Sequence, residues 1–399
     1  MGALSFCDLP CCCTPVVLMD VKAIILVGGE ATPAQQLGGV PIAFLDVLGE
    51  PVLQHVLNRL GHFGVSAAAV VTDVPVSEAP VARGIFRPGL RWMNAAGQQF
   101  WRAAEHVFND YVQSGSEIVL VIRLGAYAEV EYEELVQFHF DKQCRITSVS
   151  GPDGMALGTF VISASRRNDA AYLFRHELGE MRTPCENFQH TGYTNPLRDA
   201  ADLRMLALDS FSGWTSITPR GSEVKPGVWV GENARVHRKA RLLAPCFVGA
   251  YAKVRASSLL TRGSVVEHHV EIDCGTVVDN SSVLPMTTVG AGLDVANSVI
   301  GFSHIWNMKR NVVVKVEDRQ LIGILHGAPR RVLTNAAAIA VYLPKLIAQA
   351  ALRQRRKPQP EVTEAVHRPA AALRNTEQVT DDSIPSTTNL ISARRYGNE

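Results

Sequence analysis

Hydrophobic residues in the first half of the chain alternate between short apolar runs and longer amphipathic stretches. The runs are KAIILVG from Lys22, VSAAAVVTD from Val65 and EIVLVI from Glu117, and their length and content are typical of buried strands. The stretches PVLQHVLNRLGHFG, FWRAAEHVFNDYVQ and YEELVQFHFDK have the apolar spacing of helices. Strands that alternate with helices predict a Rossmann-like α/β fold, with a parallel sheet covered by helices on both faces.

The second half of the chain repeats an aliphatic residue at every sixth position. The repeated residues are Val224, Val230, Val236, Leu242, Val248, Val254, Leu260, Val266, Ile272, Val278 and Leu284. Such a hexapeptide repeat predicts a β-helix, whose coils stack small and branched side chains into one narrow interior. The phase slips near Pro285 and resumes at Val289 and Val295, and we expect residues 311–325 to form a strand-like cap.

The segment after the repeats changes character twice. RVLTNAAAIAVYLPKLIAQAALRQRR, from Arg331, is helical in composition, is interrupted at Pro344 and ends with basic residues. A helix that packs on the protein or on a second subunit is favoured, and a helix lying in the plane of a membrane is the alternative. From Lys357 onward, Pro, Thr, Ser, Glu and Asp without periodicity predict a disordered tail.

Composition narrows the expected partners. The chain carries 39 Lys and Arg against 38 Asp and Glu, so its charge gives no reason to expect nucleic acid or an anionic membrane as a partner. The cysteine spacing fits neither a disulfide framework nor a zinc site, which favours a cytoplasmic location. Residues 1–18 are taken as an extension that a start at Met19 would omit.

Several segments together resemble the sugar-phosphate nucleotidyltransferases, in particular the mannose-1-phosphate guanylyltransferase-like type. They are KAIILVGG, VLGEPVLQHVLNRLGHFGV, NAAGQQFWRAAEHVF, VEYEELVQFH and the hexapeptide repeats. The resemblance implies a nucleotidyltransferase-like domain at residues 19–222 and a left-handed β-helix at residues 223–325. We expect a helical segment at 326–357 and the tail at 358–399.

The activity implied by the resemblance belongs to nucleotide-sugar biosynthesis. A sugar phosphate attacks the α-phosphorus of a nucleoside triphosphate, so the site needs fixed cations and a magnesium ion. Pro33 and Ile42 stand where the family has a phosphate-binding arginine and lysine, and Gly125 and Ser216 stand where it has metal-binding aspartates. We therefore predict that the catalytic residues, the metal site and the magnesium cofactor are lost.

Ligand binding is then expected from neutral backbone donors. Gly28, Gly29 and Glu30 follow the first strand, at the sheet edge where ligands bind, and Gly97 matches a base-binding glycine of the family. The two glycines after the strand could equally serve only to turn the chain, and Gly97 could serve only to start a helix.

Histidines raise a separate alternative, because hexapeptide β-helices also build acyltransferases that use a histidine base. The candidates are His268, His269 and His304. Ordinary surface histidines are the favoured interpretation of all three.

These observations predict a pseudoenzyme of the nucleotidyltransferase family, which binds a nucleotide or nucleotide sugar in bacterial polysaccharide synthesis without catalysis. The alternative is an active nucleotidyltransferase with substitute residues, so enzymatic activity stays open. An acyltransferase and a purely structural oligomerisation module are lesser alternatives. A partner enzyme or a second copy of the chain is a further expected partner, whereas nucleic acid and membrane association are not expected.

Overall fold

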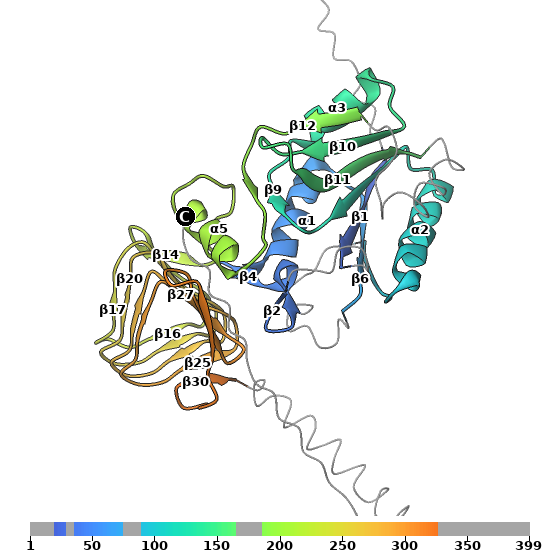
Figure 1. Ribbon diagram of the computed structural model, residues 1–399. Coiled ribbons are helices and arrows are strands. Elements are labelled where there is room, and N and C mark those ends of the chain that lie inside the picture. The colour runs from blue at the N-terminus through green and yellow to red at the C-terminus, as the bar shows by residue number, and fades with distance from the viewer. Residues whose placement is uncertain (1–19, 29–35, 75–88, 165–185, 326–399) are drawn as a thin grey trace, which may run out of the picture. The chain divides into compact units, whose positions relative to one another are not determined.

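The computed structural model describes residues 20–28, 36–74, 89–164 and 186–325. They form an α/β region up to residue 221 and a parallel-strand region from residue 222 (Figure 1). The N-terminal extension, the helical segment and the tail predicted from the sequence lie outside the described residues. None of the helices in the described ranges is long and apolar enough to cross a lipid bilayer.

Seven strands form the main sheet of the α/β region, in the order β12-β10-β11-β8-β1-β6-β7. Their bounds are β1 Val21–Val27, β6 Ala67–Thr72, β7 Leu90–Asn94, β8 Ile118–Arg123, β10 Ile146–Ser150, β11 Ala156–Ser163 and β12 Glu186–Gln189. β1 pairs in parallel with both β6 and β8, which confirms the predicted strands at the centre of the sheet.

One strand contradicts the prediction of an all-parallel sheet. β11 pairs antiparallel with both β8 and β10. β10 and β11 are joined by a tight turn, in which the Gly151 N–H donates to the Met155 carbonyl at 2.8 Å. A turn this short can only return the chain in the opposite direction, since a parallel neighbour requires a crossover of a dozen or more residues. The sheet is therefore mixed.

Helices cover both faces of the sheet (Figure 1). α1 (Val52–Phe63) and α3 (Tyr132–Asp141) contribute to the core on one face, and α2 (Gln98–Gln113) contributes to the core on the other. β1 supplies both cores, with Ile25 facing α1 and α3 and Ile24 facing α2. Successive side chains of a strand point to opposite faces, so a strand buried on both sides must be continuously apolar, as KAIILVG is.

Shorter elements connect the sheet to the rest of the chain. They are β2 Gln36–Leu37, β3 Val40–Pro41, the 3-10 helix η1 Ile42–Phe44, β4 Asp46–Val47, β5 Glu50–Pro51, β9 Tyr127–Ala128, β13 Thr194–Asn195 and helix α5 Ala200–Phe211. α5 is capped by Asp199, whose side chain accepts the N–H groups of Ala201 and Asp202. The cap fixes where the helix begins, directly after the segment that contains Asn195 and Arg198.

Three sheets form the parallel-strand region, in the orders β14-β15-β18-β21-β24-β27-β28-β29, β16-β19-β22-β25-β30 and β17-β20-β23-β26. The first comprises Ser222–Lys225, Val228–Val230, Cys246–Val248, Ser264–Val266, Ser282–Val283, Ser298–Gly301, His304–Asn307 and Val312–Lys315. The second comprises Arg235–Val236, Lys253–Val254, Glu271–Ile272, Thr287–Val289 and Ile322–Ile324. The third comprises Arg241–Leu242, Leu259–Thr261, Val277–Asp279 and Asp294–Ala296.

Residues three hexapeptides apart pair in these sheets. Val248 pairs in parallel with Val266, and Val254 pairs in parallel with Ile272. All four side chains are buried and belong to one hydrophobic cluster. The region is therefore compatible with the β-helix predicted from the repeat.

The repeat departs from the predicted register at two places. Val224 is 56% exposed and lies in β14, antiparallel to β15, so the stacked strands begin after it. The one-residue slip expected near Pro285 falls between Val278 and Val283, so Val283 rather than Leu284 pairs with Val266 and takes the interior position. Leu284 consequently packs in the cluster shared with the α/β region.

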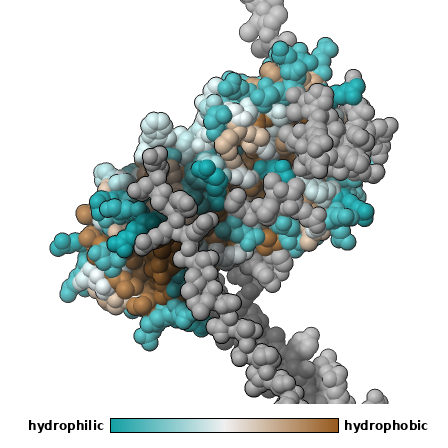
Figure 2. Space-filling model, in the orientation of Figure 1, coloured by the Kyte–Doolittle hydropathy of each residue, from teal (hydrophilic) through white to brown (hydrophobic). Residues whose placement is uncertain are grey.

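Antiparallel strands end the stack, as the predicted cap requires. β29 pairs antiparallel with β28, and β30 pairs antiparallel with β25. Hydrophobic surface gathers on the parallel-strand region in Figure 2. The exposed apolar side chains of this region include three consecutive valines of β29, namely Val312, Val313 and Val314.

Candidate functional site

A cavity of about 500 Å³ lies at the carboxyl ends of β1 and β8. Gly28 directly follows β1, while Arg123 ends β8 and Gly125 lies two residues beyond it. Open α/β sheets bind their ligands at this edge, and cavities of roughly 300 to 1,000 Å³ are typical of small-molecule sites. The cavity is therefore the candidate binding site.

Two further segments complete its walls. The turn after β10 and strand β11 contribute Asp153, Met155, Ala156, Leu157, Gly158 and Phe160. The segment before α5 contributes Thr194, Asn195, Pro196 and Arg198. Apolar side chains of β11 thus face polar groups that come from β8 and from the segment before α5.

Gly28 is explained by its neighbour as well as by the cavity. Its φ is +101°, and a Cβ atom at this position would lie 2.1 Å from Oδ1 of Asp73. A side chain would be strained at this φ and would also have to displace the aspartate, so the local geometry accounts for a glycine. The predicted site residue Gly28 lines the cavity.

Of the other predicted site residues, only Gly97 lies in the part of the chain that the structure describes. Gly29 and Glu30 lie outside the described residues. Gly97 is the N-cap of α2, with a φ of 60°, and it does not line the cavity. Its position matches the helix-start interpretation that the sequence left open.

The positions aligned with the charged groups of the family lie in three different environments. Ile42 is buried in the hydrophobic core. Gly125 lines the cavity, and a Cβ atom there would meet nothing within 4 Å. Ser216 does not line the cavity; its N–H and Oγ both donate to Oε1 of Glu129 at 2.7 Å. Ser216 therefore lies among the contacts of Glu129 and not in the lining of the cavity.

Asn195 is one of the polar side chains that line the cavity. Its Nδ2 donates to the Asp202 carbonyl at 2.9 Å, and its Oδ1 accepts the Leu197 N–H at 3.0 Å. Both ends of the amide are therefore engaged by the protein. Asn195 shapes the loop before α5 and offers little of its hydrogen-bonding capacity to a ligand.

Two arginines line the cavity, whereas the sequence interpretation expected only neutral donors. Arg198 is 65% exposed at its side chain, and its Nε donates to Oδ2 of Asp202 at 3.1 Å. Within the described chain, no hydrogen bond or ion pair involves the guanidinium of Arg123, and its Nε and Nη2 are buried and unpaired. Burial lowers the pKa of Arg123, although an arginine in a protein stays charged.

Sequence reasoning missed Arg123, although a signal for it exists. The residue ends the apolar run of β8, at the edge of the sheet where ligands bind. The other residues of β8 are apolar and cannot pair with the charge of Arg123. A cation at the end of an apolar strand, at the ligand-binding edge of the sheet, is therefore the signal.

Carboxylates of the cavity are scarce. Asp153 lines the wall, and its Oδ1 accepts the Met155 N–H at 3.1 Å. Among the residues that the structure describes, no three histidines, cysteines, aspartates or glutamates come together in a group able to hold a metal ion.

A second polar cluster lies where β4 contacts the parallel-strand region. Glu267 is buried, and its carboxylate accepts the N–H groups of Leu48 at 2.9 Å and Gly49 at 3.0 Å. Asp46 is 4% exposed, and its Oδ2 lies 3.2 Å from Nε2 of His268. The expectation of a surface histidine is therefore wrong for His268, which has a buried carboxyl as its partner.

Burial shifts the proton affinities of this cluster. It raises the pKa of Asp46 to about 7, with further repulsion from Glu50. The pKa of Glu267 lies well above its usual value, chiefly because of burial and then because of the charge of Asp46. The hydrogen bonds from the backbone N–H groups of Leu48 and Gly49 lower it only in part. Burial also lowers the pKa of His268. Burial thus favours the neutral form of each of the three groups.

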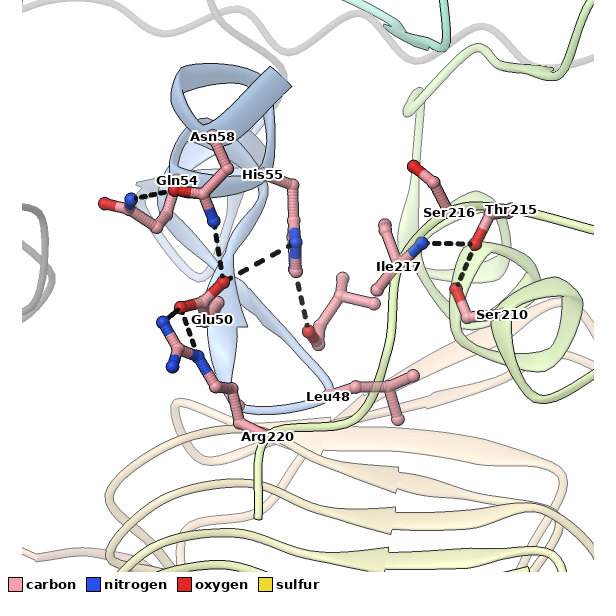
Figure 3. Close-up of polar contacts among 12 residues, drawn as sticks. Leu48, Glu50, Gln54, His55, Asn58, Ser210, Thr215, Ser216, Ile217 and Arg220 are labelled. Atoms are coloured by element: carbon pink, nitrogen blue, oxygen red, sulfur yellow. Dashed lines mark hydrogen bonds and ion pairs between the residues drawn. The ribbon is translucent and has the colours of Figure 1, made fainter. Parts of the chain in front are cut away.

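Glu50, whose charge acts on Asp46, has polar contacts of its own, which Figure 3 shows. Its carboxylate pairs with Arg220 and accepts Nδ2 of Asn58 at 3.1 Å. His55 lies between Glu50 and the Val47 carbonyl, with its Nδ1 3.8 Å from Oε2 of the glutamate. Arg220 thereby compensates the charge of Glu50. Among the contacts that the structure describes, neither Asp46 nor Glu267 pairs with an arginine or a lysine.

Comparisons with known proteins return no family model that matches this chain and no curated protein that matches it. The function is therefore inferred from the residues of the cavity.

Proposed function

We propose that the protein binds a nucleotide or nucleotide sugar in the cavity and does not catalyse nucleotidyl transfer. Its α/β region would be a Rossmann-like, nucleotidyltransferase-like domain and its parallel-strand region a left-handed β-helix, in a protein of bacterial polysaccharide synthesis. One observation carries the proposal. The cavity at the ends of β1 and β8 contains an uncompensated cation, Arg123, but only Gly125 where the family resemblance calls for a metal-binding aspartate.

The walls of the cavity suit the two halves of such a ligand. Met155, which is 50% exposed, and the exposed Ala156 offer apolar surface for a base or a sugar ring. Arg123 offers charge for a phosphate. Sites of this kind combine apolar walls with a few placed polar groups, and a volume of about 500 Å³ accommodates a nucleotide.

Catalysis would require charge that these residues do not supply. Attack on the α-phosphorus gathers negative charge on several oxygens, and each group that stabilises such charge is worth about 3 to 4 kcal/mol. Loss of a metal ligand at Gly125 and of the cations at Pro33 and Ile42 would together remove about 10 kcal/mol even when non-additivity is allowed for. This corresponds to about a ten-million-fold loss in rate.

An active nucleotidyltransferase with substitute residues is the second candidate. It is favoured by the presence of one cation and one carboxylate, Arg123 and Asp153, in the wall of the same cavity. Release of pyrophosphate from a nucleoside triphosphate and a sugar 1-phosphate separates the two candidates. Magnesium-dependent turnover near one per second would establish the second and refute the first.

Ligand binding itself is tested by thermal unfolding in the presence of UDP-glucose, GDP-mannose and their parent mono- and triphosphates. A ligand at 100 times its Kd should stabilise the protein by about 2.7 kcal/mol. Ala156→Trp would fill the cavity from an exposed position and should abolish the shift, whereas Ala201→Trp, on the exposed surface of α5 outside the cavity, should leave it intact. Equal shifts in both variants would place the ligand elsewhere.

A further inference from the structure

We infer that Arg123 binds a phosphate group of the ligand directly, without a metal ion between the guanidinium and the phosphate. The identity of the ligand rests on the proposed function, whereas the recognition of an anion by Arg123 is tested separately below. Arg123 would thus be a ligand-binding residue, and its single charge would favour ligands with few negative charges.

The charge of Arg123 is compensated by nothing that the structure describes. Its Nε and Nη2 atoms are buried without a hydrogen-bond partner, and no carboxylate of the described chain pairs with it. A half-buried charge whose donors are unpaired is unfavourable in a protein, so such an arrangement is expected where a ligand compensates the charge. An anion in the cavity would do so through the donor that remains accessible.

The position of the guanidinium is fixed by an aromatic ring. Cζ of Arg123 lies 5.7 Å from the ring centroid of Trp101, which belongs to α2. A contact of this kind holds a guanidinium without using its N–H donors. Since Nε and Nη2 are buried, Nη1 is the donor left accessible, and the residue lines the cavity.

The other charged groups of the wall suit this role less well. Arg198 is 65% exposed and its charge is already paired with Asp202, and the carboxylate of Asp153 would repel a phosphate. One uncompensated positive charge remains. It matches one phosphate group better than the triphosphate of a nucleotide, whose charge would need a metal ion as well. The ligands that fit best are therefore a nucleoside monophosphate or a nucleotide sugar.

Calorimetry on the full chain tests the inference, with UMP, UDP-glucose, GMP and GDP-mannose as nucleotides and with inorganic phosphate and pyrophosphate as simple anions. Each titration is made with magnesium and with a chelator. Arg123→Gln removes the charge and Arg123→Lys keeps it without the planar fork. Arg91→Gln, an exposed arginine paired with Asp110 and outside the cavity, is the matched control.

We expect Arg123→Gln to weaken nucleotide binding at least tenfold, Arg123→Lys to weaken it less, and Arg91→Gln to leave it unchanged. Chelation should change affinity less than threefold. Uridine and guanosine, which carry no phosphate, should bind equally to the wild type and to Arg123→Gln. The melting temperature of each variant is measured alongside, and Arg123→Gln should fold because it removes a buried charge.

The outcomes separate this inference from the proposed function. Nucleotide binding that Arg123→Gln leaves intact would overturn the inference and keep the proposed function. If no nucleotide binds but phosphate or pyrophosphate binds in a manner dependent on Arg123, the proposed function fails and the anion site stands. If none of these ligands binds the wild type, both are overturned.

Discussion

Replacement of Asp46 by Asn should make the protein more stable in alkaline solution and reduce the dependence of its stability on pH. The carboxyl is 4% exposed and has His268 as its neighbour at 3.2 Å. Burial lowers the pKa of this histidine, so it does not supply a compensating positive charge near pH 7. An amide at position 46 is neutral at every pH and keeps a donor for the imidazole.

The size of the effect follows from the raised pKa of Asp46. Burial, and then the charge of Glu50, raise it from 3.8 to about 7. The carboxyl therefore binds its proton more tightly in the folded chain than in the unfolded chain. The stability this contributes is complete below about pH 4 and is lost as the pH rises through about 7. At about 1.4 kcal/mol per pKa unit, the whole effect is about 4 kcal/mol, of which roughly 2.5 kcal/mol falls between pH 5 and pH 8.

Unfolding by urea at pH 5 and at pH 8 measures this difference. Asp46 alone should account for about 2.5 kcal/mol of the unfolding free energy that the wild type loses between the two values, and Asp46→Asn should lose clearly less than the wild type. Some dependence will remain in the variant, because Glu267 also has a raised pKa and is relieved of the charge of Asp46. Asp141→Asn, an exposed carboxyl on α3, serves as the control. An identical pH dependence in wild type and Asp46→Asn would refute the reasoning.

Three further predictions concern the cavity, the stacked strands and the exposed valines. Gly125→Asp meets no neighbour within 4 Å, so it should fold and make triphosphate binding dependent on magnesium, as calorimetry with and without chelator would show. Val254→Asp buries an unpaired charge at a position 2% exposed and should prevent cooperative folding of the parallel-strand region, so a soluble variant that melts cooperatively would mean that the repeat register is wrong. Val313→Lys should lower the molar mass measured by light scattering if the exposed edge strand β29 pairs with a second copy, and an unchanged mass at equal concentration would count against that contact.

Local patterns predicted the elements that depend on local chemistry. α1 ends at Gly64, whose φ of 95° is the left-handed conformation that a helix-terminating glycine adopts, as expected from the sequence. The hexapeptide repeat likewise identified the buried residues from Val248 to Val278. Both signals arise because burial of one face imposes a period on the residues that form it.

The direction of β11 and the register near Leu284 were not predicted, for different physical reasons. The turn between β10 and β11 contains Gly151, Asp153 and Gly154, which are typical turn residues, so a hairpin was readable in principle. The slip at Val283 was not, because Leu284 is also aliphatic and buried. Only the contact with the α/β region distinguishes the interior residue from its neighbour.

The polar clusters could not be predicted because their partners are distant in sequence. Glu267 accepts the N–H of Leu48, 219 residues earlier, and Asp46 meets His268 across the same contact. A glutamate that directly follows Val266 gives no sign of burial on its own. The burial of Glu267 results from packing between the α/β region and the parallel-strand region. The hydrophobic pattern of each region predicts its elements without reference to this residue.

The cavity shows a different limit, because its charge depends on which groups stay unpaired. Counting the positions that the family fills with charge finds only losses, at Ile42 and Gly125, and suggests a neutral site. Arg123 lies two residues before Gly125 and has no partner in the described chain, so the same edge of the sheet loses a carboxylate and keeps a cation. Because position 125 carries no carboxylate, a metal ion would lack that ligand in the cavity. Because the guanidinium of Arg123 is unpaired, it could neutralise a phosphate without a metal ion. Both features support the proposal that the cavity binds a phosphate ester without a metal ion and without catalysis.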